Sequence, residues 1–280
     1  MKAYLQLVRA PAALTVLGDT VAGAAAAGNP LRGRRLLLPL SSVSFYWAGM
    51  ALNDWADRAL DAVERPERPI PSGRISPEQA LAVAGGLTAA GLGLARAAGG
   101  RDTLRIALPL AAAVWAYDTV LKNTAAGPAA MAACRTLDVL MGGAGRQAVR
   151  TAIAVGGHTY GVTALSRGEV HGATTKTANA ALAGTGITAL AAATGARTWR
   201  DRLGALAFTG VYANTVGRAQ YDAAQDPSAT RVRVATMAGI HGMVPLQAAL
   251  AARRGSLLGA FAVAAALPVA KALARKVSPT

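Results

Sequence analysis

A run of acidic and amide side chains follows an apolar stretch of the chain at residues 53–76. Asn53, Asp54, Asp57 and Asp61 follow one another at helical spacing. If the run is helical, this spacing places all four near one helix face. Carboxylates stacked in this way repel one another unless a cation lies between them, and their oxygen atoms suit Mg²⁺. The spacing therefore predicts a magnesium site formed by these four residues.

Basic residues follow the carboxylates at once, as Arg65, Arg68 and Arg74. Protein-bound Mg²⁺ usually takes substrate phosphates among its ligands, and guanidinium groups bind phosphate oxygens in bidentate fashion. The stretch thus has the parts needed to bind a diphosphate bridged by Mg²⁺. The prolines and glycine of RPIPSG, residues 68–73, favour a lid-like loop. The alternative is a solvated helix end whose charges pair internally.

The elements that hold this stretch are apolar. The chain has 280 residues, of which 53% are hydrophobic and 15% charged, with a mean hydropathy of +0.33. Soluble domains carry about 25% charged residues, and a membrane span needs about 20 mostly apolar residues. Several candidate spans are marginal, so we expect nine or ten. The candidate spans are 10–28, 36–53, 77–98, 103–121, 126–145, 149–165, 177–194, 202–220, 231–252 and 255–274.

These spans predict an all-α fold, because a helix satisfies its own backbone in lipid. We expect residues 1–280 to form a single transmembrane bundle around a central cavity, with the first span retained rather than cleaved as a signal peptide. Small residues recur at helix-packing spacing. The net charge is +15, but the basic residues fall between spans, which indicates membrane headgroups as partners and not nucleic acid. The single cysteine, Cys134, excludes an internal disulfide and a thiol metal site.

Residues 53–76 resemble the first motif of the UbiA-type intramembrane prenyltransferases. That motif reads N-D-x-x-D-x-x-x-D, followed by an R-P-x-x-S-G loop, and both parts occur here. The resemblance implies Mg²⁺-dependent transfer of a polyprenyl group from its diphosphate to an acceptor, which the sequence does not identify. On this interpretation Asp54 and Asp57 are catalytic metal ligands, and Arg65 and Arg68 bind substrate.

Two further segments are similar to the family. LVRAPAAL has an arginine and a proline in the first span, so Arg9 would help to hold the diphosphate. YDTVLK matches the pattern Y-x-x-x-L-K, which implies that Tyr117 binds substrate and that Lys122 binds phosphate and takes part in catalysis.

The chain departs from the family at its second acidic motif, typically D-x-x-x-D after the sixth span. The stretch at 156–178 has Glu169 as its one carboxylate. Three readings follow: Glu169 holds a second metal alone, Arg167 and Lys176 replace the charge of that metal, or the transferase activity is lost. His158 and His171 lie in the same stretch as candidate acid–base groups, or else as packed side chains.

Other ionisable residues lie inside spans. Asp138 follows Arg135 by about one turn, which predicts a buried ion pair that is either functional or stabilising. Asp19 and His241 are isolated and more typical of structural roles.

A rival function is a transporter or lipid-binding membrane protein, with these intramembrane charges as ion relays. Transporters usually show internal repeats, and the second half of the chain has no convincing duplicate of residues 53–76. We expect an integral, multi-pass protein of a bacterial plasma membrane.

Overall fold

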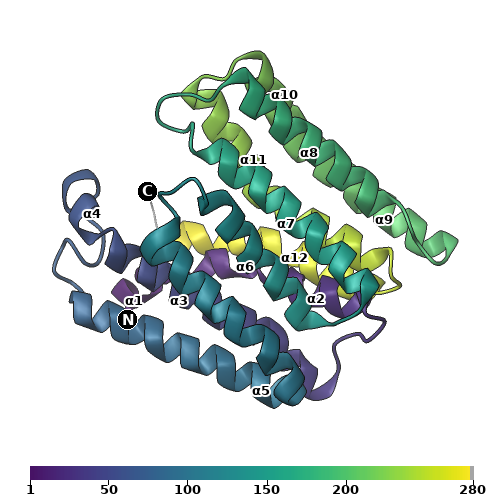
Figure 1. Cartoon of the computed structure of the whole chain (residues 1–280), viewed down its shortest axis with the longest axis horizontal. Coiled ribbons are helices and arrows are strands. Elements are labelled where there is room, and N and C mark those ends of the chain that lie inside the picture. The colour runs from purple at the N-terminus through teal and green to yellow at the C-terminus, as the bar shows by residue number, and fades with distance from the viewer. Residues whose placement is uncertain (278–280) are drawn as a thin grey trace.

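The computed structural model describes residues 1–277, and its regular structure in that range is helical, without strands (Figure 1). Short 3₁₀ turns occupy Ala10–Thr15 and Gly33–Leu36, and single π-helical turns occupy Tyr117–Leu121 and Ala213–Gly217. The α-helices are α1 Lys2–Leu7, α2 Leu17–Ala26, α3 Leu37–Ala56, α4 Arg58–Glu64, α5 Pro77–Ala116, α6 Gly127–Gly142, α7 Arg146–Ser166, α8 Thr175–Ala193, α9 Trp199–Tyr212, α10 Arg218–Gln225, α11 Ala229–Ala252 and α12 Leu257–Val277.

A helical segment lies at each of the ten predicted spans, which confirms the all-α bundle. α5 covers two of them, because Gly100 breaks it with φ 70° and ψ −150°, a left-handed conformation open to glycine. α9 and α10 form one span through the π-helical turn between them. By length and hydropathy, two segments of the described residues could cross a membrane unaided, Pro77–Leu121 and Ala229–Ala252. The other helices are shorter or less apolar.

Small residues allow close helix crossings, most clearly where α2 meets α6. A Cβ on Gly23 would lie 1.9 Å from the carbonyl oxygen of Val139, and one on Gly142 would lie 2.2 Å from that of Thr20. Neither position can therefore carry a side chain at this separation of the helices. Gly91 packs in the same way, since a Cβ there would lie 2.9 Å from the ring of Phe45.

The helices alternate in direction, so their connections gather at two ends of the bundle. The near end carries α4, the loop at 65–76 and the connections at 122–126, 167–174 and 226–228. At this end Ala173 N donates to Pro227 O. The far end carries the connections at 27–36, 143–145, 194–198 and 253–256, with the kink at Gly100. In Figure 1, α4 projects on the left and the α8–α9 connection lies on the right.

Candidate functional site

Asp54 and Asp61 converge on one guanidinium group at the near end. Arg68 Nη1 lies 2.6 Å from Asp61 Oδ2 and 3.3 Å from Asp54 Oδ1, and both carboxylates are almost completely buried. Arg9 approaches Asp54 Oδ1 from the other side, with its Nη2 at 3.2 Å. Arg9 has φ 46° and ψ 51° where α1 turns into the following 3₁₀ helix, a rare backbone conformation for a non-glycine residue. The predicted site residues Arg9, Asp54, Asp61 and Arg68 therefore form one cluster.

Asp57 takes a different direction, because the helix is interrupted at this residue. α3 ends at Ala56 and α4 begins at Arg58, so the four predicted ligands do not share one continuous helix face. Asp57 Oδ1 lies 2.7 Å from Lys122 Nζ. Lys122 directly follows the π-helical turn at 117–121, and such turns are frequent at functional sites. The structure thus joins the acidic stretch to the predicted phosphate-binding lysine.

Asp118 is a site residue that sequence reasoning missed. It is buried, and its Oδ1 accepts a hydrogen bond from Asn53 Nδ2 at 3.3 Å. Its other oxygen lies close to the backbone of α3, where a Cβ on Gly49 would be 3.2 Å away. The signal was the acidic residue beside Tyr117 in the YDTVLK segment. The acidic group at the near end therefore has a fifth oxygen-bearing member.

Arg65 and Arg74, which we placed beside the carboxylates, do not contact them. Arg65 is exposed, and its guanidinium group makes none of the side-chain hydrogen bonds or ion pairs recorded among the described residues. Arg74 donates to Gln6 Oε1 at 2.6 Å and to Ser72 Oγ at 2.9 Å, and so holds the 65–76 loop closed. The loop ends in a capping box in which Ser76 caps α5.

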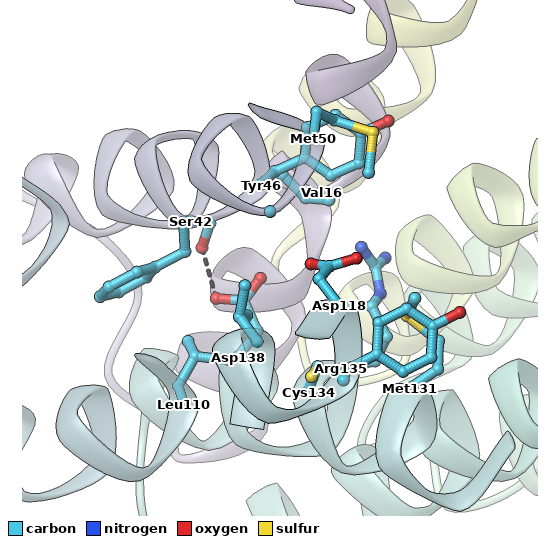
Figure 2. Close-up of a pocket in the computed structure, with 14 residues that line it drawn as sticks. Val16, Ser42, Tyr46, Met50, Leu110, Asp118, Met131, Cys134, Arg135 and Asp138 are labelled. Atoms are coloured by element: carbon cyan, nitrogen blue, oxygen red, sulfur yellow. Dashed lines mark hydrogen bonds between the residues drawn. The ribbon is translucent and has the colours of Figure 1, made fainter. Parts of the chain in front are cut away.

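An inner cavity of about 120 Å³ lies beside this cluster, between α3, α5 and α6. Its wall is mostly apolar, with Phe45, Leu110 and Val114 among the lining residues. Figure 2 shows the lining side chains, including Asp118 and the hydrogen bond from Ser42 to Asp138. An apolar chamber next to a charged cluster suits a ligand with a charged head and an apolar tail.

A central cavity of about 420 Å³ adjoins the inner one, because Tyr46, Met50, Tyr117, Met131 and Arg135 line both. Arg9 links it to the ion-pair cluster.

The second half of the chain contributes Glu169, Thr159 and Ser166 to the wall of the central cavity. Glu169 thus faces the same space as the predicted substrate-binding residues Arg9 and Tyr117.

The other candidate residues in the stretch at 156–178 have different surroundings from Glu169. Arg167 donates from its guanidinium to the carbonyl oxygen of Thr124, beside Lys122. Lys176 and His171 are exposed. His158 is buried, with Nδ1 2.9 Å from Tyr212 Oη and Nε2 3.0 Å from Gly239 O. Both nitrogens of its ring have partners, so the packed interpretation of His158 fits the structure.

The predicted ion pair between Arg135 and Asp138 is wrong. Arg135 instead pairs with Asp19, its Nε lying 3.0 Å from Oδ2 and its Nη2 3.1 Å from Oδ1. Gln247 Nε2 donates to the same carboxylate at 2.7 Å. Asp138 accepts from Ser42 Oγ at 2.6 Å. The cause is the crossing of α2 and α6, which brings Asp19 to Arg135 and which spacing along one helix cannot reveal.

The donor set of the cluster fits Mg²⁺, which prefers carboxylate and amide oxygens. Within the described residues, no three carboxylate, histidine or cysteine side chains gather tightly enough to form a ready metal site. The reason is that Asp54, Asp57 and Asp61 pair with Arg9, Arg68 and Lys122. The residues that the sequence predicts as metal ligands are thus paired with the basic residues that it predicts to bind a diphosphate.

The sequence model of the UbiA prenyltransferase family matches residues 14–277. The chain belongs to the UbiA prenyltransferase family. This confirms the resemblance that residues 53–76 bear to a family of prenyltransferases, and it counts against the transporter. Members of this family are integral membrane proteins.

Curated relatives support the same family. Digeranylgeranylglyceryl phosphate synthase of Methanopyrus kandleri is 40% identical over 125 residues, which are 44% of this chain and 45% of that protein. Chlorophyll synthase of Arabidopsis thaliana is 34% identical over 100 residues, 34% of this chain and 26% of that protein. The chain thus spans less than half the length of these relatives in the matches. The archaeal and plant sources do not fit the expected bacterial membrane.

Solved UbiA-type structures share the fold. A structure described as digeranylgeranylglyceryl phosphate synthase in membranes has a TM-score of 0.67 at 18% identity, covering 92% of this chain and 98% of that one. A UbiA homologue from Archaeoglobus fulgidus bound to GPP and Mg²⁺ has a TM-score of 0.61 at 17% identity, covering 94% and 99%. The bundle of this chain is therefore a UbiA-type bundle.

Proposed function

We propose that this protein transfers a polyprenyl group from its diphosphate to an acceptor within the membrane, with Mg²⁺ as cofactor. The observation that carries the proposal is the convergence of Arg9, Arg68 and Lys122 with the carboxylates of the first motif beside an apolar cavity. The cations match the diphosphate head, and the cavity offers an apolar surface for the prenyl chain. The GPP and Mg²⁺ bound to the Archaeoglobus fulgidus homologue support this assignment.

The protein's own part in the reaction is to hold charge and exclude water. As the bond between the allylic carbon and the diphosphate oxygen breaks, the electron pair leaves with the diphosphate. Arg9, Arg68 and Lys122 are placed to stabilise that growing charge through charge-assisted hydrogen bonds. The apolar walls of the inner cavity shield the cation-like carbon from water. The acceptor then forms the new bond to this carbon and gives up a proton.

Asp118 is our candidate for taking that proton. Its carboxylate lines the inner cavity and is held by Asn53 of the first motif. It is not among the recorded ion pairs of the described residues, unlike Asp54, Asp57 and Asp61.

Asn53, Asp54, Asp57 and Asp61 would hold Mg²⁺ together with the diphosphate. The metal would supply Lewis-acid neutralisation of the leaving group. To receive it, the carboxylates must exchange their present arginine and lysine partners for the metal, while those cations turn to phosphate oxygens. Glu169 lines the central cavity and would assist a second metal.

The molecule that accepts the prenyl group is less well defined than the prenyl donor. The archaeal relatives named digeranylgeranylglyceryl phosphate synthase favour a prenylated glycerophosphate, whereas chlorophyll synthase points to a different acceptor. The deciding experiment incubates purified protein with labelled geranylgeranyl, farnesyl and longer diphosphates, Mg²⁺, and either geranylgeranylglyceryl phosphate or a membrane extract. Labelled product with Mg²⁺ and none with EDTA supports the proposal. Mg²⁺-dependent binding without turnover on any acceptor would instead favour the reading that transferase activity is lost.

A further inference from the structure

The far end of the bundle has a strong excess of positive charge that the proposed reaction does not use. Among the described residues, the carboxylates at this end are Asp102 and Asp201. The near end, by contrast, carries most of the carboxylates of the chain. Each of the far-end segments has at least two arginines, at 32–35, 101–105, 146–150, 197–202 and 253–254.

Three of these arginines line one cavity of about 650 Å³. Arg32 comes from the α2–α3 connection, Arg197 from the α8–α9 connection, and Arg254 from the α11–α12 connection. Segments far apart in the sequence therefore bring three guanidinium groups to one hollow (Figure 1 shows the α8–α9 connection at the right edge).

The three arginines have little internal compensation. None of them belongs to an ion pair recorded among the described residues. The side chain of Arg254 makes one long hydrogen bond among those recorded for the described residues, 3.4 Å from Nη1 to Gly195 O. Burial lowers the pKa of the Arg254 guanidinium, the nearby positive charge of Arg197 lowers it further, and the Asp201 carboxylate raises it in part. The carboxylate in the cavity wall, Asp201, is buried and accepts the backbone N–H of Thr198 as the cap of α9.

Apolar side chains flank the same cavity. Leu36 and Leu258 line it and are 57% and 86% exposed. In a helix bundle that crosses a membrane, exposed leucines beside arginines mark the boundary between headgroups and acyl chains. A free phosphate ion would contact the arginines alone, whereas a phospholipid would contact the arginines with its headgroup and the leucines with its acyl chains.

We propose that this far-end cavity binds the phosphate headgroup of an anionic phospholipid, with Arg32, Arg197 and Arg254 as its ligands and Leu36 and Leu258 against its acyl chains. Guanidinium groups suit phosphate oxygens because they donate in bidentate fashion. Basic pockets between membrane helices are known to bind the headgroups of anionic lipids. The site is separate from the diphosphate cluster, which lies at the opposite end of the bundle.

The test uses native mass spectrometry of the full-length protein, delipidated in neutral detergent and titrated with phosphatidylglycerol, cardiolipin or phosphatidylcholine. The intact protein should retain the anionic lipids and not phosphatidylcholine. The triple variant R32Q/R197Q/R254Q should bind the anionic lipids on the order of a hundredfold more weakly, as expected for the loss of three arginines near a lipid surface. The matched control R34Q/R101Q/R146Q removes three arginines from the same end but outside the cavity, and should bind almost as tightly as the parent.

Equal weakening in the two triple variants would show a general surface-charge effect and overturn the site. Equal binding of phosphatidylcholine would overturn it as well, and displacement of the lipid by millimolar inorganic phosphate would show a free-anion site instead. If the glutamine variant does not fold, R32K/R197K/R254K decides the matter. This lysine variant keeps the positive charges but cannot donate two hydrogen bonds from one side chain to the phosphate. It should therefore bind anionic lipid several-fold more weakly than R34K/R101K/R146K. No difference between the lysine variants would contradict the proposal.

Discussion

Lys122 Nζ lies 2.7 Å from Asp57 Oδ1, which joins the π-helical turn after α5 to the break between α3 and α4. The contacts of Arg68 to Asp54 and Asp61 form a second group of alternating charges at the same end of the bundle. Under the proposed function, both groups open when the carboxylates bind the metal and the basic side chains bind the diphosphate.

Replacing Lys122 or Arg68 with alanine should weaken the binding of a prenyl diphosphate. A hydrogen bond to a charged group contributes about 1.5–3 kcal/mol, so roughly a ten- to hundredfold rise in Kd is expected for each variant. Isothermal titration calorimetry in detergent with Mg²⁺ measures it. The control is Arg58→Ala, which removes an exposed arginine beside Asp57 that contacts Trp55. Unchanged Kd in both test variants would remove these residues from the site.

Variants of Glu169 and of its basic neighbours distinguish between the interpretations of the stretch at 156–178. If Glu169 assists a second metal, Glu169→Ala should raise the Mg²⁺ concentration needed for half-maximal rate and leave activity at saturation. If Arg167 and Lys176 replace that metal, Glu169→Ala should have little effect and the double variant Arg167→Gln/Lys176→Gln should lose much more rate. The structure favours Glu169, since it lines the central cavity while Lys176 is exposed. A Mg²⁺ titration of initial rates separates the two readings.

Asp118→Asn should lower the maximal rate, because an amide cannot take the acceptor's proton. The amide can still contact Asn53, so the fold and the Kd for prenyl diphosphate should change little. A fall in kcat at saturating Mg²⁺ with an unchanged Kd supports a proton acceptor. A normal kcat that requires more Mg²⁺ would instead make Asp118 a metal ligand, and no change in either quantity would exclude it from the chemistry.

Gly23→Ala should destabilise the bundle, because the new Cβ would lie 1.9 Å from the carbonyl oxygen of Val139 and would push α2 away from α6. Overpacking of this kind costs about 1–3 kcal/mol. Gly86→Ala is the matched control, since nothing lies within 4 Å of its Cβ and the helix propensity of alanine should help slightly. Thermal unfolding in detergent should show a lower Tm for Gly23→Ala alone. Equal Tm values would mean that the α2–α6 crossing is looser than the structure shows.

The sequence predicted the parts of this protein that depend on local pattern. Apolar length located the ten spans, including the two halves of α5 on either side of Gly100. The motifs located Asp54, Asp57, Arg68 and Lys122, which form ion pairs in the structure. It could not predict contacts set by how helices cross. Arg135 pairs with Asp19 on another helix and not with Asp138 on its own.

Two features of the site itself were also not predicted from the sequence. The interruption at Asp57 redirects that carboxylate to Lys122, and a helical spacing rule assumes that no interruption occurs. Asp118 became a site residue only because the π-helical turn and α3 lie side by side.

The most direct test of the central claim is the Mg²⁺-dependent consumption of labelled prenyl diphosphate by the parent protein and by Asp54→Ala and Asp57→Ala. Asp54 lies in the cluster with Arg9 and Arg68, Asp57 pairs with Lys122, and we assign both carboxylates to the metal. The account therefore predicts turnover in the parent, and none in either variant at any Mg²⁺ concentration, with Tm close to that of the parent. Full activity in both variants would contradict the metal–diphosphate assignment.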